Sequence, residues 1–374
     1  MQKAFGNRAL TFLVTTSFLA ASIAAAGSLA VGFAGYFAEV WSLPPGLLVS
    51  LGLMVVLTVV NFVGISESVV VNVALTAAEF LGLVIIIGIG IWYAAEGSAD
   101  FSTLTDFTTD GSPVLAVISG VALAFFAMTG FENAANVAEE TVEPERVFPR
   151  ALVAGMATAG VVYVLTAISA ALVVGPKALS ASDAPLLEVV DAGVLPVSVT
   201  VLGTVFAVIA MCAIANTTLV AVVTQSRVLY GMAREDVVPE VFARVHERRH
   251  SPYVGLVFSL VVVSALLVIG TVLTETGGLD LVTRLAAVTV VFLLFIYALV
   301  IIAALRLRGR DDRDGGFRAA TPLLWLGLVG NAVLLGYVVQ DDPASLYWVA
   351  GLLGIGLALL LVQWAITRRR PAHG

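Results

Sequence analysis

Ten apolar stretches, each about as long as a membrane is thick, follow one another along the chain. A helix rises about 1.5 Å per residue, so about 20 apolar residues cross roughly 30 Å of hydrocarbon. The stretches cover residues 10–37, 45–63, 67–93, 114–138, 151–175, 198–223, 253–274, 282–305, 321–340 and 345–366. Only 12% of the residues are charged, against about 25% in soluble domains. The pattern predicts an all-α polytopic membrane protein with ten transmembrane helices.

The basic residues indicate the orientation. Ten spans place both ends of the chain on one side of the bilayer, and 17 of the 19 Lys and Arg residues fall on that side. Only Lys177 and Arg284 fall elsewhere. Because loops on the cytoplasmic side collect Lys and Arg, we expect both termini in the cytoplasm and a location in the cell membrane.

The stretch from Val114 to Pro149 contains an interrupted helix. An apolar run ends at Ala127, Thr129 and Gly130 break it, and Glu132 follows directly. Broken helices free backbone groups that persist at membrane depth only where they line a polar site, and secondary transporters bind substrates at such breaks. The alternative is an ordinary spanning helix with a packing glycine.

Two carboxylates lie within apolar spans, where a charge is costly unless it faces water or a partner. Glu79 lies in the middle of the third span. It is either a proton-coupling or substrate-contact group, or a protonated donor between helices. Glu132 is either a substrate-linked proton site or the cap of a second half-helix, whose N-terminal dipole would stabilise its charge.

Four further features bear on the site and its surroundings. The polar residues 216–218 interrupt the sixth span, either lining a site or packing between helices. Residues 224–227 are expected to mark the cytoplasmic exit of that span. Arg284 follows Asp280 by four residues, which predicts a structural ion pair on one helix face. The stretch 176–197 is expected to hold a short surface or re-entrant helix.

The residues that several other functions require do not occur in this sequence. No nucleophile–base pair, intramembrane histidine set or phosphate-binding Gly-Lys-Ser/Thr loop occurs. We therefore expect no enzymatic activity, no cofactor, no metal and no nucleic-acid partner; the expected partners are a small substrate, coupling ions and lipid.

Two long motifs carry a family resemblance. Residues 125–132 (FFAMTGFE), 138–141 (AEET), 144–146 (PER) and Pro149 resemble the sixth helix and following loop of amino acid–polyamine–organocation (APC) permeases. Residues 226–236 (SRVLYGMARED), Pro239 and the Ser251-Pro252 break resemble that family's eighth helix and its loop. The motifs occur in the family's order, and the resemblance covers essentially the whole chain.

The resemblance implies a fold of five helices, five inverted helices and two more. Residues 1–93 would belong to the first repeat, 114–305 would form the second, 321–366 would be the two last helices, and 367–374 a cytoplasmic tail. Aligned by the motifs, the first span matches the family's third helix. We therefore expect this chain to lack the first two helices, including one that is broken and holds the substrate carboxylate.

The resemblance also implies site residues. Phe126 would be an aromatic gate over the substrate, and backbone carbonyls between Phe126 and Thr129, around Ala127 and Met128, would accept the substrate ammonium. Gly130 would permit the unwinding. Glu132 would be a protonatable link behind the site. Glu79 is a second candidate for proton coupling because of its place within an apolar span and not because of the resemblance, since many relatives carry a lysine there. Thr217 would line the pocket from the eighth helix.

These expectations combine into one hypothesis and a rival. The hypothesis is an amino acid permease that works by alternating access, with protons as coupling ions and sodium as the alternative. We expect the 374-residue chain to be inactive alone and the addition of two helices to restore uptake. The rival is a non-transporting membrane scaffold or sensor derived from a permease.

Overall fold

The computed structural model describes residues 2–63, 69–105, 112–134, 142–249, 251–278, 280–308 and 318–369. The long helices are α2 (Arg8–Val40), α3 (Gly46–Val63), α4 (Val69–Ala95), α5 (Pro113–Ala127), α6 (Pro144–Val173), α9 (Val199–Arg234), α10 (Tyr253–Gly277), α11 (Leu281–Leu307), α12 (Thr321–Asp341) and α13 (Ser345–Arg369). Short helices are α1 (Gln2–Phe5), α7 (Pro176–Ala181), α8 (Pro185–Asp191), η1 (Phe101–Thr105) and η3 (Glu240–Ala243).

The predicted architecture is confirmed. Among the residues that the structure describes, ten helices are long and apolar enough to cross a membrane, and there is no strand. The loop at 176–197 contains the expected short helices, α7 and α8. The inverted-repeat relation and the division of the chain into repeats stay predictions.

Two helices differ from the predicted spans. Helix α6 begins at Pro144 rather than at 151, because proline suits a first helical position, where the missing N–H needs no partner. Helix α9 continues past 224–227 to Arg234, and the membrane exit expected at these residues stays a prediction. Arg227 is exposed, whereas the Gln225 side chain is fully buried, and its Nε2 donates to the carbonyl oxygen of Ser22 at 2.9 Å.

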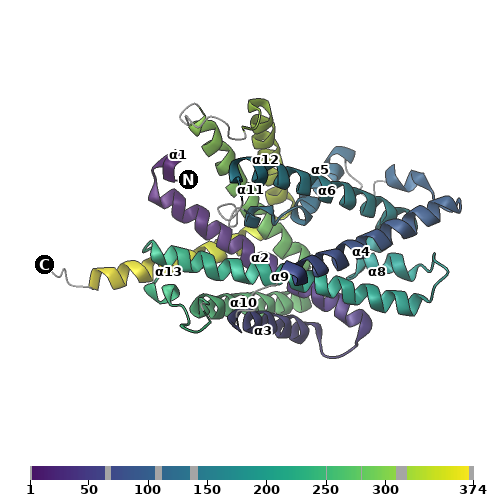
Figure 1. Cartoon of the computed structure of the whole chain (residues 1–374), viewed down its shortest axis with the longest axis horizontal. Coiled ribbons are helices and arrows are strands. Elements are labelled where there is room, and N and C mark those ends of the chain that lie inside the picture. The colour runs from purple at the N-terminus through teal and green to yellow at the C-terminus, as the bar shows by residue number, and fades with distance from the viewer. Residues whose placement is uncertain are drawn as a thin grey trace.

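Helix α2 lies at the centre of the molecule and packs closely against α9 and α11 (Figure 1). Its sequence permits this because its buried face consists largely of alanines, and small residues let membrane helices approach closely. Hydroxyl groups bridge the same contacts. The Oγ of Ser22 donates to the Ala221 carbonyl of α9 at 3.2 Å, and the Oγ of Ser28 donates to the Val282 carbonyl of α11 at 3.0 Å.

Buried apolar residues form three clusters. The largest joins α2, α3, α9, α10, α11 and α13. The second joins α4, α6 and α8 to the first half of α9, and there Gly90 lies so close to Ser169 that a Cβ would be 2.3 Å from its side chain. The third joins α5, α11 and α12. The clusters surround the cavity described below, whose walls come from all three.

The expected ion pair of Arg284 has a different partner. Asp280 is the N-cap of α11 and accepts from the amides of Val282 and Thr283 at 3.1 and 3.3 Å. The Nη1 of Arg284 instead lies 2.6 Å from the Oδ1 of Asp342, at the end of α12. The cap occupies the carboxylate of Asp280, so Arg284 links two helices rather than two turns of one helix.

Candidate functional site

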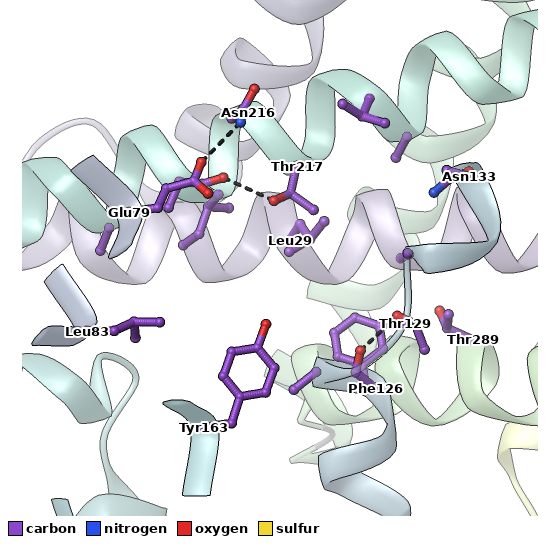
Figure 2. A pocket seen from close by; sticks show the side chains of 18 of the residues that line it. Leu29, Glu79, Leu83, Phe126, Thr129, Asn133, Tyr163, Asn216, Thr217 and Thr289 are labelled. Atoms are coloured by element: carbon purple, nitrogen blue, oxygen red, sulfur yellow. Dashed lines mark hydrogen bonds between the residues drawn. The ribbon is translucent and has the colours of Figure 1, made fainter. Parts of the chain in front are cut away.

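A cavity of about 780 Å³ lies between α2, α4, α5, α6, α8, α9 and α11. Figure 2 views it from close by, with side chains from these walls around the open space. Most of the residues predicted for the site meet here, although they are far apart in the sequence. They are Glu79, Phe126, Ala127, Thr129, Gly130, Glu132 and Thr217. Met128 lies beside them but contributes to a neighbouring cavity instead.

The wall of this cavity contains the predicted helix break. Helix α5 ends at Ala127, residues 128–130 form a turn, and a 3₁₀ turn covers 131–134. Gly130 has φ +110°, a conformation that L-residues rarely adopt and glycine adopts freely. The amide of Asn133 donates to the Gly130 carbonyl at 3.0 Å, which starts the next turn. The glycine therefore allows the backbone to change direction at the cavity.

The backbone carbonyl oxygens at the end of α5 differ in how many hydrogen bonds they already accept. The Phe126 oxygen accepts from the Thr129 amide at 3.1 Å and from the Thr129 hydroxyl at 2.7 Å. Among the described residues, no amide donates to the carbonyl oxygens of Met128 or Thr129. A helix C-terminus carries a partial negative charge. This end of α5 therefore offers acceptors to a positively charged group in the cavity.

Glu132 connects the break to α11. Its Oε2 accepts from the amide of Gly130 at 2.9 Å and from the hydroxyl of Tyr297 at 2.8 Å. The Tyr297 ring also packs near Phe125 and Phe131, with ring centroids 5.8 and 5.4 Å apart. One carboxylate thus links the backbone at Gly130 to a second helix. The sequence reasoning missed Tyr297, which is one tyrosine within an apolar span and carries no local signal.

Glu79 is the second carboxylate of the cavity wall. The Nδ2 of Asn216 donates to its Oε1 at 3.0 Å, joining α4 to α9 (Figure 2). The Oδ1 of Asn216 is buried and accepts no hydrogen bond from the described residues. Helix α9 runs unbroken through this point, and the hydroxyl of Thr217 donates to the Ala213 carbonyl at 3.1 Å. The polar residues 216 and 217 therefore line the cavity without breaking the helix, while Thr218 is fully buried.

Other lining residues escaped the sequence reasoning as well. Tyr163 of α6 points its hydroxyl into the space between the walls, and Thr289 of α11 lies beyond the α5 turn (Figure 2). The available signal was weak, because single Tyr and Thr residues are common in membrane helices. Only the packing of the helices shows that both side chains line the same cavity.

A second cavity of about 440 Å³ adjoins the first. It lies between the α5 turn and α6, and it shares Ala127, Thr129 and Tyr163 with the first. Its remaining walls are apolar or small side chains, including Met128, Phe131 and Gly155. Polar chemistry is therefore concentrated in the larger cavity.

Comparisons with known proteins agree with this architecture. A family model described as "Amino acid permease" matches residues 1–363. An uncharacterized transporter of Mycobacterium tuberculosis is 29% identical over 345 residues, covering 92% of this chain and 71% of the relative. The branched-chain amino acid permease BcaP of Bacillus subtilis is 22% identical, covering 81% of this chain and 65% of the relative.

The name of a third relative includes an amine, putrescine. The low-affinity putrescine importer PlaP of Escherichia coli is 24% identical over 219 residues, covering 56% of this chain and 47% of the relative. The motifs around Gly130, the ten spans and the match to the family model over nearly the whole sequence lead to one conclusion: the chain belongs to the amino acid permease family of APC transporters.

Proposed function

We propose that the chain binds amino acids or related amines in the 780 Å³ cavity and carries them across the cell membrane by alternating access. The observation that carries the proposal is the turn after α5, where the Thr129 carbonyl, which accepts from no backbone amide of the described residues, and the carboxylate of Glu132 meet at one cavity wall. Membrane transporters bind charged substrates at such broken helices because the freed backbone groups replace water.

The substrate ammonium would bind at the carbonyl oxygen of Thr129, the residue of this turn that lines the cavity and whose oxygen accepts from no backbone amide of the described residues. The Phe126 oxygen already accepts two hydrogen bonds, both from Thr129. The Phe126 oxygen could accept a hydrogen bond from the substrate ammonium only if the Thr129 hydroxyl rotated away. Phe126 itself lines the cavity next to this turn, where its ring would cover a bound substrate as an aromatic gate.

Proton coupling would act through Glu132. As a carboxylate, its Oε2 accepts from both Gly130 and Tyr297. A proton on that oxygen would compete with these donors and weaken the connection between the broken segment and α11. Glu79 is the alternative coupling residue, since it lines the same cavity and bridges α4 and α9. Sodium remains the alternative coupling ion.

The relatives support a substrate with an amino group. Their printed names cover branched-chain amino acids, cationic amino acids and putrescine, and the ammonium is the one charged group that all three share. The common chemistry fits the acceptor-rich turn. The distribution of Lys and Arg supports an orientation with both termini in the cytoplasm.

Binding and uptake together test the proposal. The purified chain is measured in detergent for saturable binding of radiolabelled amino acids and amines, and in liposomes for uptake with and without an inward proton gradient. We expect saturable binding that Glu132→Gln weakens, and any uptake to increase with the gradient. Binding without uptake would support the site and the expectation that this chain is inactive alone. Absence of both would favour the scaffold or sensor.

A further inference from the structure

We infer that the cavity selects substrates with two ammonium groups on one aliphatic skeleton, and that Glu79 binds the ammonium that the α5 turn does not. This inference rests on the proposed function and adds the substrate class to it. Its basis is a pair of carboxylates on different walls of one cavity, Glu79 on α4 and Glu132 after α5.

The charge of the lining favours cations. Glu79 and Glu132 are both acidic, and none of the described residues that line the cavity is Lys, Arg or His. A bound substrate with a single positive charge leaves one carboxylate without a cationic partner. A substrate with two positive charges matches both, which removes the cost of an uncompensated charge in a site with apolar walls.

The threonine hydroxyl groups of the lining add acceptors rather than donors. Each threonine hydroxyl there donates its proton to a backbone carbonyl. The acceptors are Phe126 for Thr129 at 2.7 Å, Val162 for Thr166 at 2.8 Å, Ala213 for Thr217 at 3.1 Å, and Leu285 for Thr289 at 2.9 Å. A hydroxyl that donates in this way keeps only its lone pairs for a ligand. The cavity therefore presents acceptors to groups that, like ammonium, only donate.

Two donors of the wall already donate to the two carboxylates. The amide of Gly130 donates to Glu132, and the side-chain amide of Asn216 donates to Glu79; the hydroxyl of Tyr297, on α11, also donates to Glu132. For a substrate carboxylate, the cavity offers neutral donors such as the Tyr163 hydroxyl and the Asn133 amide. A carboxylate is thus admissible beside two ammonium groups, but it has no cationic partner among the lining residues that the structure describes.

The arrangement in Figure 2 suits an elongated ligand. Glu79 and the turn from Phe126 to Thr129 lie on different walls, and Tyr163 points between them. The aromatic faces of Phe126 and Tyr163 can contact the alkyl chain or an ammonium, because cations are attracted to aromatic faces. One ammonium would bind at the turn near Glu132, and the other would bind at Glu79.

Two matched pairs of probes test the inference on the purified full chain at pH 7.5. L-ornithine differs from L-norvaline by one amino group, and 1,4-diaminobutane differs from 1-aminobutane in the same way. We expect the diammonium member of at least one pair to bind about tenfold to a hundredfold more tightly, as a charge-assisted hydrogen bond predicts. Binding of diaminobutane without ornithine would mean that the cavity also rejects the carboxylate.

Glu79→Gln identifies the residue responsible. The glutamine side chain keeps an oxygen that can accept from Asn216, so the contact between α4 and α9 is preserved. We expect the preference for the diammonium probe to disappear while the affinity for its monoammonium partner stays unchanged. Glu79→Asp retains the charge and should retain part of the preference. Glu275→Gln, an exposed carboxylate at the end of α10, is the control and should change nothing.

Each remaining outcome overturns a specific statement. Equal binding within both pairs by the wild-type chain would refute selection for two ammonium groups while leaving the proposed function intact. An undiminished preference in Glu79→Gln would refute the role of Glu79. Failure of all four probes, together with failure of the other amino acids, would refute the proposed function itself.

Discussion

Replacing Gly130 by alanine tests the backbone conformation on which the site depends. The glycine has φ +110°, and an added Cβ would meet no atom within 4 Å. The substitution therefore introduces no clash, and its cost is conformational. A non-glycine residue held in a sparsely populated backbone region costs about 1–3 kcal/mol. We expect Gly130→Ala to lower the free energy of unfolding by that amount.

Gly120, on the helix that precedes the turn at Gly130, is a matched control. It lies within α5, its Cβ position is equally open, and its φ is not positive. Alanine in a helix interior is more stable than glycine by about 0.5–1 kcal/mol. Gly120→Ala should therefore stabilise the protein slightly, and the two variants should differ by about 1.5–4 kcal/mol.

The assay is unfolding by SDS in mixed micelles, followed by far-ultraviolet circular dichroism, with ligand binding measured in parallel. Gly130→Ala should lose stability and binding together, whereas Gly120→Ala should keep binding. Gly130→Leu should insert into the membrane and abolish binding. If Gly130→Ala were as stable as Gly120→Ala and bound ligand normally, the turn after α5 would not need a positive φ and the assignment of the break would be wrong.

Three further predictions concern the links between helices and the orientation. Tyr297→Phe keeps the ring contacts but removes the donor to Glu132, so the free energy of unfolding in the same assay should fall by about 1.5–3 kcal/mol, the value of a hydrogen bond to a charged group; no change would mean that the bond does not form. A double-mutant cycle of Arg284→Met and Asp342→Asn should give a coupling of about 0.5–2 kcal/mol; additive effects would contradict the ion pair. In a Cys212→Ser background, His373→Cys should resist labelling by an impermeant thiol reagent outside intact cells; efficient labelling would place the C-terminus outside.

Sequence alone determined the number and type of the long elements, because both follow from local chemistry. A long apolar run has few alternatives to a membrane helix, since every backbone group must find a partner without water. The prediction of ten spans is therefore confirmed. The break after Ala127 was equally accessible, because a glycine beside a threonine and a carboxylate is a local signal, and Gly130 does have a positive φ.

Local chemistry was less reliable at helix ends. Polar residues at 224–227 predict the cytoplasmic exit of the sixth span, which stays a prediction; α9 itself continues to Arg234, and Gln225 has a partner on α2. Asp280 and Arg284 had the spacing of a helical ion pair, yet the cap of α11 uses the aspartate. The one-dimensional pattern does not contain the partner on another helix in either case.

Only the tertiary structure decided which polar groups act together. Glu79 pairs with Asn216 across 137 positions, and Glu132 pairs with Tyr297 across 165. Such pairs depend on the rotation and crossing of whole helices. The apolar pattern does not specify these, because most faces of a membrane helix are apolar. The sequence could therefore identify both carboxylates as unusual, but their shared cavity and the direction of its hydroxyl groups arise from the packing of α2, α4, α9 and α11.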